Sequence, residues 1–322
     1  MKNWINRLRG GSDTLSTASA TLADDSEEEA GSVAGEIDAA YYRWLSATRA
    51  YAAPADVESR ILDELRLLAS QPGDAAGLVP RVPDAIPRLL ASLGEADVSI
   101  AQLAQQVAED VVLVAEVIRE ANSAYYRPIA PVKNVESALM MLGQNGLRML
   151  LARIAFRPLV TMQADGFARE AAPVVWNQSV SCALAASLMA PGLGSGVFQA
   201  YLAGLMQNIG MVVAFRLADR ICPGGQVPGS SAFGARLLGA SRHLSSAIAA
   251  HWQFPEDVVR AIAHAGAPEA DALAQALALG DRIAKLRLLI DAKVLQENDS
   301  LVSDVLDIFQ RRCLSKLSKL ES

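Results

Sequence analysis

The feature that most constrains this chain is a long run without a charged side chain, from Ala171 to Phe215. Such a run must be kept from water, either in a membrane or inside a large protein core. Pro191 and several glycines divide the run, and serines and side-chain amides interrupt it. Because a membrane span needs about 20 mostly apolar residues in succession, we expect core helices rather than two membrane spans.

The composition predicts helices packed on helices. The chain has 322 residues, of which 52% are hydrophobic and only 5% are aromatic, and it is long enough to bury a large core. It is rich in Ala and Leu, which favour helices. No segment alternates between polar and apolar residues as a half-buried strand does. We therefore predict an all-α fold.

The charge and the cysteines narrow the classes of function. With a net charge of -6, we expect no nucleic-acid partner. Cys182, Cys222 and Cys313 are far apart and odd in number, so they suggest neither a disulfide framework nor a metal site. No apolar segment typical of a signal peptide follows the basic first residues. These features predict a cytoplasmic protein.

Two adjacent amides, Gln207 and Asn208, lie inside the uncharged run. A buried amide without hydrogen-bond partners costs on the order of a few kcal/mol. The pair is therefore either part of a satisfied structural network or the remains of a chemical site.

Short motifs in a characteristic order run through both halves of the chain. They are Glu109–Asp110, Ala121–Ala124, Ala138–Gly143, Val175–Ser179, Ala203–Gly210, and the segment from His243 through His251–Pro255 to His264. In order and spacing these motifs resemble the HDOD family, a mostly non-catalytic branch of the HD-domain phosphohydrolase superfamily. The family motif residues are Asp110, Asn122, Ser123, Gly143, Trp176, Gly204, Gly210, His243 and His264. The family usually has proline after the Asp, where this chain has Val111.

The resemblance implies a degenerate metal site. Active HD-domain enzymes bind metal through a His, an adjacent His–Asp pair and a later Asp, which are suitable ligands for divalent metals. The resemblance places these four positions at Gln178, Gln207, Asn208 and Asp281. Three of the four are neutral amides, so we expect no bound metal, no cofactor and no catalytic residue.

Each of these residues also has a structural interpretation, which we weigh against a functional one. Gln178, Gln207 and Asn208 form either a pocket for a small ligand or a polar network between core helices, and we favour the network. We expect Asp281 to pair with Arg282 near a helix surface or to accept hydrogen bonds from the amides.

The motif residues outside this site have predicted structural roles. We expect Asn122 to bond the backbone at a helix end and Gly143 to end a helix in the left-handed conformation. The histidines His243, His251 and His264 could form a metal site, but no short ligand spacing links them. We expect them to pack or cap helices.

The same features divide the chain into segments. The predicted segments are a disordered acidic tail (1–35), an N-terminal helical extension (36–78), the HDOD domain (79–291, with halves at 79–160 and 170–291) and a C-terminal amphipathic helix (292–322).

These expectations favour a non-enzymatic bacterial signalling module that binds other signalling proteins. A small-molecule effector bound in the degenerate pocket would regulate the binding of these partners. The alternative is a metal-dependent phosphohydrolase with rearranged ligands, which would use Asp281 and some of the histidines. A third hypothesis is a membrane-associated scaffold that uses the basic, apolar tip Met1–Arg9.

Overall fold

A computed structural model describes residues 33–73, 107, 111–123, 128–161 and 166–317 of the chain. Residues 1–32 of the predicted acidic tail and Asp110 therefore lie outside the described residues, whereas residues 33–35, predicted as part of the tail, begin the first described helix. The first helices and strand are α2 (Val33–Ser46), β1 (Ala50–Tyr51), α3 (Ala55–Ser70), α6 (Val111–Ala121), α7 (Val135–Thr161) and α8 (Gly166–Leu193). There follow α9 (Val197–Met206), α10 (Ile209–Ile221), the 3-10 turn η2 (Pro223–Gly225), β2 (Val227–Pro228), α11 (Ser231–His251), α12 (Glu256–His264), α13 (Ala272–Asp291), α14 (Ser300–Ser303) and α15 (Ile308–Leu317).

The uncharged run forms the central helices α8, α9 and α10. One described stretch, Val197–Ile221, is apolar and long enough to cross a membrane by length and composition alone. However, 78% of the most apolar 18-residue segment within this stretch is buried inside the protein. The stretch also turns at Gln207–Asn208, between α9 and α10. This burial is what a core helix of a large helical protein requires.

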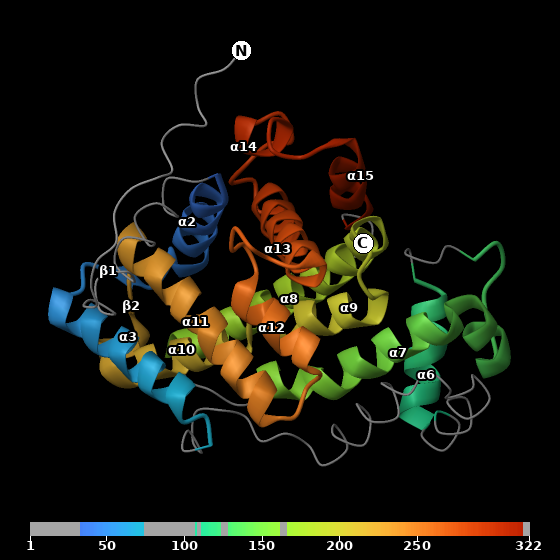
Figure 1. Ribbon diagram of the computed structural model, residues 1–322, viewed down its shortest axis with the longest axis horizontal. Coiled ribbons are helices and arrows are strands. Elements are labelled where there is room, and N and C mark those ends of the chain that lie inside the picture. Colours follow the sequence, from blue (N-terminus) through green and yellow to red (C-terminus); the bar gives the residue numbers. More distant parts are fainter. Residues whose placement is uncertain (1–32, 74–106, 108–110, 124–127, 162–165, 318–322) are drawn as a thin grey trace, which may run out of the picture.

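The predicted all-α fold is confirmed. Helices account for nearly all the regular structure, and β1 and β2 are only two residues long each. These strands pair in parallel, with Ala50 opposite Val227 and Tyr51 opposite Pro228. Figure 1 shows α3 at one end of the molecule and α6 at the other, with α8 to α13 between them.

The N-terminal helices pack directly against the second half of the protein. Helix α3 contacts α11, and α2 contacts both α11 and α13. The hydroxyl of Tyr42 on α2 donates a hydrogen bond to the carbonyl of Pro228, 2.6 Å away. A Cβ at Gly234 on α11 would lie 2.4 Å from the ring of Tyr42, so glycine permits the close approach of α2 and α11.

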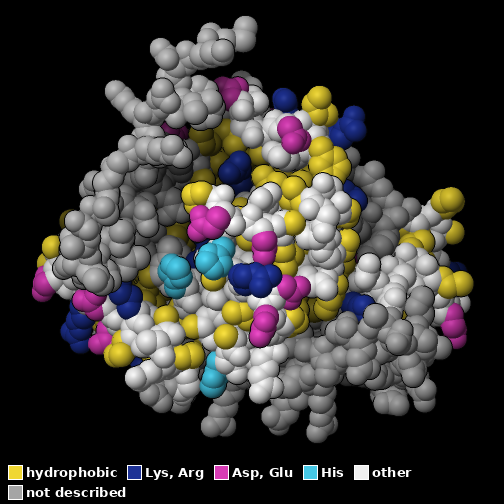
Figure 2. Space-filling view, viewed as in Figure 1, with side chains coloured by type: hydrophobic (Ala, Val, Ile, Leu, Met, Phe, Trp, Pro, Cys, Tyr) yellow, Lys and Arg dark blue, Asp and Glu magenta, His cyan; other side chains and the backbone are white. Residues whose placement is uncertain are grey.

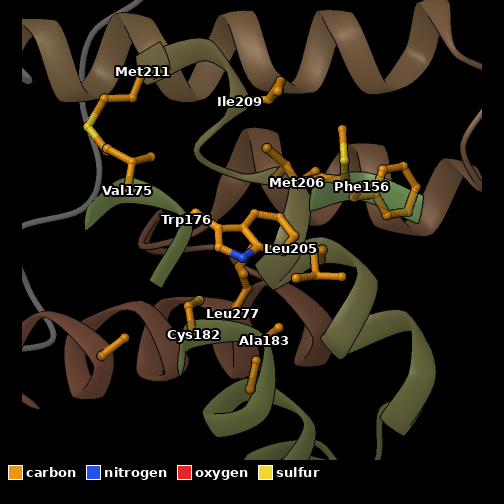
Figure 3. Close-up of a cluster of buried hydrophobic side chains, with 14 of the residues drawn as sticks. Phe156, Val175, Trp176, Cys182, Ala183, Leu205, Met206, Ile209, Met211 and Leu277 are labelled. Atoms are coloured by element: carbon orange, nitrogen blue, oxygen red, sulfur yellow. The ribbon is translucent and has the colours of Figure 1, made fainter. Parts of the chain in front are cut away.

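The core is centred on contacts between α8, α9 and α13. Figure 3 shows the buried Trp176 of α8 close to Leu205 of α9 and Leu277 of α13. The helices approach closely because two glycines face α8. A Cβ at Gly204 would lie 2.5 Å from the Cα atom of Ala183, and one at Gly280 would lie 2.7 Å from the backbone nitrogen of Ala186.

Two local predictions differ from the structure. Gly143 has a positive φ of 64°, but its ψ of -178° is extended rather than left-handed helical. This conformation is open almost only to glycine, and it produces a kink inside α7 instead of a simple helix end. The C-terminal region forms two helices, α14 and α15, where one was predicted. Its apolar spacing continues across a break at residues 304–307, so periodicity alone did not reveal the break.

The close approach at Gly204 generates a direct test of the packing. We expect Gly204→Ala to destabilise the protein by about 1–3 kcal/mol, because the new methyl group would overlap the backbone of α8. Gly239→Ala on α11 is the matched control, since no atom lies within 4 Å of its added Cβ. It should instead stabilise the helix by about 0.5–1 kcal/mol. Urea unfolding at neutral pH measures both changes, and equal stabilities for the two variants would contradict this packing.

Candidate functional site

The four positions implied by the resemblance lie together in the core. Gln178 comes from α8, Gln207 and Asn208 form the turn between α9 and α10, and Asp281 lies in the middle of α13. Oδ1 of Asp281 accepts hydrogen bonds from Nε2 of Gln178 at 2.5 Å and from Nε2 of Gln207 at 2.9 Å. The amide of Asn208 donates to Oε1 of Gln178 and, at 3.1 Å, to Oγ of Ser179.

Asp281 does not form the predicted pair with Arg282. Its Oδ2 atom instead accepts a hydrogen bond from Nζ of Lys285 at 2.6 Å. Residues four apart on a helix share a face, whereas adjacent residues point in different directions. Only 7% of Asp281 and 3% of Lys285 are exposed, so this ion pair is a core contact rather than a surface contact.

A second carboxylate reaches the same ammonium from the N-terminal extension. Nζ of Lys285 lies 2.5 Å from Oδ1 of Asp38 on α2, and it lies 5.6 Å from the ring centroid of Tyr41. Sequence reasoning missed Lys285 and Asp38. The spacing of Asp281 and Lys285 could have revealed the first partner, but nothing local connects Asp38 to a residue so distant in the chain.

The charges in this network stabilise one another. Burial opposes ionisation of Asp281, but the positive charges of Lys285 and of Arg242 on α11 lower its pKa below the ordinary value. Burial also opposes the charged form of Lys285, yet Asp281 and Asp38 raise its pKa above the ordinary value. Both residues are therefore ionised at neutral pH. Burial, together with the two carboxylates, raises the pKa of Tyr41, so its hydroxyl stays neutral.

Neutral groups complete the network. Gln207 also donates through Nε2 to Sγ of Cys182 at 2.9 Å, and burial raises the pKa of this thiol well above its ordinary value. Oγ of Ser245 on α11 lies 2.6 Å from the carbonyl of Gln207 and accepts from the backbone N–H of Gly210 at 2.9 Å. A Cβ at Gly210 would lie 2.1 Å from the carbonyl of Ser241. The turn between α9 and α10 is thus bonded to three other helices.

Comparison with known proteins identifies the family. The HDOD domain model matches residues 79–268, which is more than half of the chain. This chain belongs to the HDOD domain family. The match begins at the predicted start of the domain and ends before α13, so Asp281 and Lys285 lie beyond it. No curated protein matches the chain in sequence.

Solved structures share the HDOD fold. An HDOD domain protein of unknown function from Geobacter sulfurreducens is 23% identical, with a TM-score of 0.57, and the match covers 80% of this chain and 94% of that chain. A protein proposed to be a metal-dependent phosphohydrolase, from Shewanella amazonensis SB2B, is 18% identical with a TM-score of 0.56, over 81% and 99% of the two chains.

A third similar structure is a protein proposed to act in signal transduction, from Marinobacter aquaeolei VT8. It is 21% identical with a TM-score of 0.55, over 82% of this chain and 66% of that chain. Because all three sequence identities are below 25%, these similarities establish the fold of this HDOD protein alone.

The motif residues Asn122 and Ser123 lie outside the network, at the end of α6. Asn122 donates through Nδ2 to the carbonyls of Ile118 and Val132, both at 2.8 Å, and accepts from the backbone N–H of Val132 at 2.8 Å. It thereby connects the end of α6 to the following loop, as predicted. Oγ of the neighbouring Ser123 is buried without a hydrogen-bond partner among the described atoms.

The histidines do not join the buried network. His243, His251 and His264 are all exposed, and Figure 2 shows histidine side chains at the molecular surface. Asp281 is buried. Among the residues that the structure describes, no group of three or more His, Cys, Asp or Glu side chains could hold a metal ion. The rearranged ligand set of the alternative hypothesis is therefore not assembled in this part of the HDOD protein.

The HD-type metal position does not fit a divalent ion in this chain. Oδ1 of Asp281 already accepts two amide hydrogen bonds, and Oδ2 accepts one from an ammonium group. Gln207 and Asn208 supply neutral side chains instead of an imidazole and a carboxylate, which are the usual ligands for such metals. The arrangement joins α2, α8, α9 and α13 through hydrogen bonds, and we derive no metal-assisted step from it.

The lowered pKa of Asp281 generates a prediction about stability and pH. A carboxyl group with a folded pKa below its unfolded value, about 3.9, stabilises the folded protein above that value. The contribution is lost as the pH falls through the folded pKa. We expect Asp281→Asn to lower the free energy of unfolding by about 3–5 kcal/mol at pH 7, because Lys285 loses a buried partner. This difference should shrink below about pH 4.

Urea unfolding followed by circular dichroism from pH 3 to pH 7 measures this difference. The control is Asp63→Asn, since Asp63 pairs with Arg66 on the exposed face of α3. It should change the stability by less than about 0.5 kcal/mol throughout. An Asp281→Asn variant as stable as the native protein at pH 7 would show that the buried pair does not stabilise the fold.

Proposed function

We propose that this HDOD protein is a non-enzymatic regulatory module of a bacterial signalling system, which acts in the cytoplasm by binding other proteins. The observation that carries the proposal is the buried ion pair of Asp281 and Lys285, surrounded by the amides of Gln178 and Gln207. These side chains donate to and accept from one another, which leaves few of their polar atoms free to act on a substrate. The similar protein from Marinobacter aquaeolei, proposed to act in signal transduction, is consistent with this role.

The buried network does not favour regulation by a small-molecule effector bound at this site. Any polar ligand at Gln178, Gln207 or Asn208 would have to replace hydrogen bonds that these side chains already make. Breaking buried hydrogen bonds is costly unless each group finds a new partner. We therefore place the regulatory contacts on the surface of the protein.

Helix α15 offers a suitable contact surface. Its inner residues Cys313, Leu314 and Leu317 are buried, and the helix packs against α13 and α8. In the first turn of the helix, Ile308 is 68% exposed and Phe309 is 55% exposed. Figure 2 shows hydrophobic and basic side chains together at the upper right, over the position of α15 in Figure 1.

The charges around this surface indicate the kind of partner. Arg311 and Arg312 are exposed beside Ile308 and Phe309, within a chain whose net charge is -6. Adjacent exposed aromatic and arginine side chains are typical of the centres of protein interfaces. The exposed apolar area at the start of α15 is too small for stable insertion into a membrane, which requires a large apolar face. An acidic protein segment with apolar side chains suits this surface.

The contact surface can be tested by affinity purification from the native host. We expect Phe309→Glu to remove proteins that co-purify with the native chain, because it places a charge in the apolar centre of the interface and weakens binding by about 2 kcal/mol or more. Leu67→Glu on α3 is the control, since Leu67 is similarly exposed but lies on a different helix. Equal loss of partners from both variants, or no loss from Phe309→Glu, would contradict this surface.

The alternative function is hydrolysis of a phosphoester, which the similar protein from Shewanella amazonensis suggests. We expect purified protein supplied with Mg²⁺, Mn²⁺ or Zn²⁺ to hydrolyse bis(p-nitrophenyl) phosphate no faster than the metal in buffer. The physical reason is that three of the four metal positions hold neutral amides, and the carboxylate of Asp281 is already bonded to two amides and an ammonium group. Metal-dependent turnover that is lost in Asn208→Leu would replace the regulatory proposal with an enzymatic one.

A further inference from the structure

We infer that Lys285 is a built-in cation that replaces a divalent metal in this site, and that it makes helix α2 a part of the site. The inference goes beyond the proposed function, since it holds whatever partners the protein binds. Its basis is the position of one ammonium group between two carboxylates from distant parts of the chain.

The first step is the position of the positive charge. Nζ of Lys285 lies 2.6 Å from Oδ2 of Asp281 and 2.5 Å from Oδ1 of Asp38. An ammonium group has three hydrogens to donate and can bridge two carboxylates, as a bound cation would. The side chain of Lys285 is 4% exposed, so this charge is not provided by a mobile surface lysine.

The second step is the balance of charge around the site. The carboxylates of Asp281 and Asp38 carry two negative charges. Lys285 and the nearby guanidinium of Arg242, whose charge acts on both Asp281 and Lys285, carry two positive charges. The cluster is therefore neutral without any added ion. A divalent cation would leave it with an excess of positive charge in surroundings of low dielectric constant, where such repulsion is strong.

The third step concerns which residue excludes the metal. The replacement of imidazole and carboxylate by amides at Gln178, Gln207 and Asn208 removes ligands for a metal. Lys285 adds a separate barrier, because its ammonium occupies Oδ2 of Asp281. Restoring the missing ligands should therefore be insufficient for metal binding as long as Lys285 is present.

The fourth step connects the site to the N-terminal extension. Asp38 and Tyr41 both belong to α2, and both face Lys285. Removal of Asp38 would leave the buried ammonium of Lys285 with Asp281 as its remaining carboxylate partner among the residues that the structure describes. Docking of α2 should therefore depend on Lys285, and α2 should loosen first when this ion pair is broken.

The metal test uses the full chain and Mn²⁺ alone as the probe. The first variant carries Gln178→His, Gln207→His and Asn208→Asp, and the second adds Lys285→Met. By isothermal titration calorimetry, we expect the triple variant to bind Mn²⁺ no better than the native protein. The quadruple variant should bind it roughly 10- to 100-fold more tightly, which is the range for changes around a metal site.

Two results of this titration would overturn the inference. One is a triple variant that binds Mn²⁺ as tightly as the quadruple variant. The other is a folded quadruple variant that does not bind Mn²⁺. The matched control adds Lys293→Met to the triple variant, because Lys293 lies just beyond α13 and is exposed. This control should behave like the triple variant.

A second measurement tests the inference if the quadruple variant does not fold. Asp38→Asn leaves the pair of Lys285 and Asp281 in place, so the core should remain folded. By hydrogen exchange with mass spectrometry, we expect the amides of α2 to exchange roughly 10-fold faster in this variant, while those of α8 are unchanged. Asp63→Asn on α3 is the control. Unchanged exchange in α2 would show that Lys285 does not join this helix to the site.

Discussion

The ion pair between Asp281 and Lys285 is the interaction on which the surrounding structure depends. Two charges in a core are expensive unless each is paired and hydrogen-bonded. This requirement explains why Gln178 and Gln207 direct their amide groups at Asp281 and why Asp38 reaches Lys285 from α2. These partners come from α8, from the turn between α9 and α10, and from α2, so satisfying one buried pair fixes the relative positions of several helices.

Close packing makes this arrangement possible. Gly204 and Gly280 allow α9 and α13 to approach the backbone of α8, which brings Gln207 and Asp281 within reach of Gln178. Larger side chains at these positions would separate the helices and lengthen the hydrogen bonds between them. The absence of charge from Ala171 to Phe215 follows from the same geometry, because these helices are surrounded by other helices and offer few routes by which a charged group could reach water.

Much of this account could be predicted from the sequence, because it depends on local patterns. The all-α fold follows from composition and spacing, and Gln207 and Asn208 attract notice as amides in an apolar run. Of the two partners predicted for Asp281, the amides are present, but the ion pair with Arg282 is not, and helix periodicity favours Lys285 instead. Asp38 could not be predicted, because its contact joins helices at opposite ends of the chain and depends on the tertiary fold. The break between α14 and α15 was also missed, since the apolar spacing runs through it.

The most direct measurement is a crystal structure of the native protein grown with Mn²⁺, with anomalous diffraction data to locate the metal. The account predicts no anomalous peak at Asp281 and electron density for Nζ of Lys285 within hydrogen-bonding distance of both Asp281 and Asp38. An anomalous peak coordinated by Asp281, with Lys285 turned away from it, would contradict the account. That result would show that the site retains metal chemistry in the native protein.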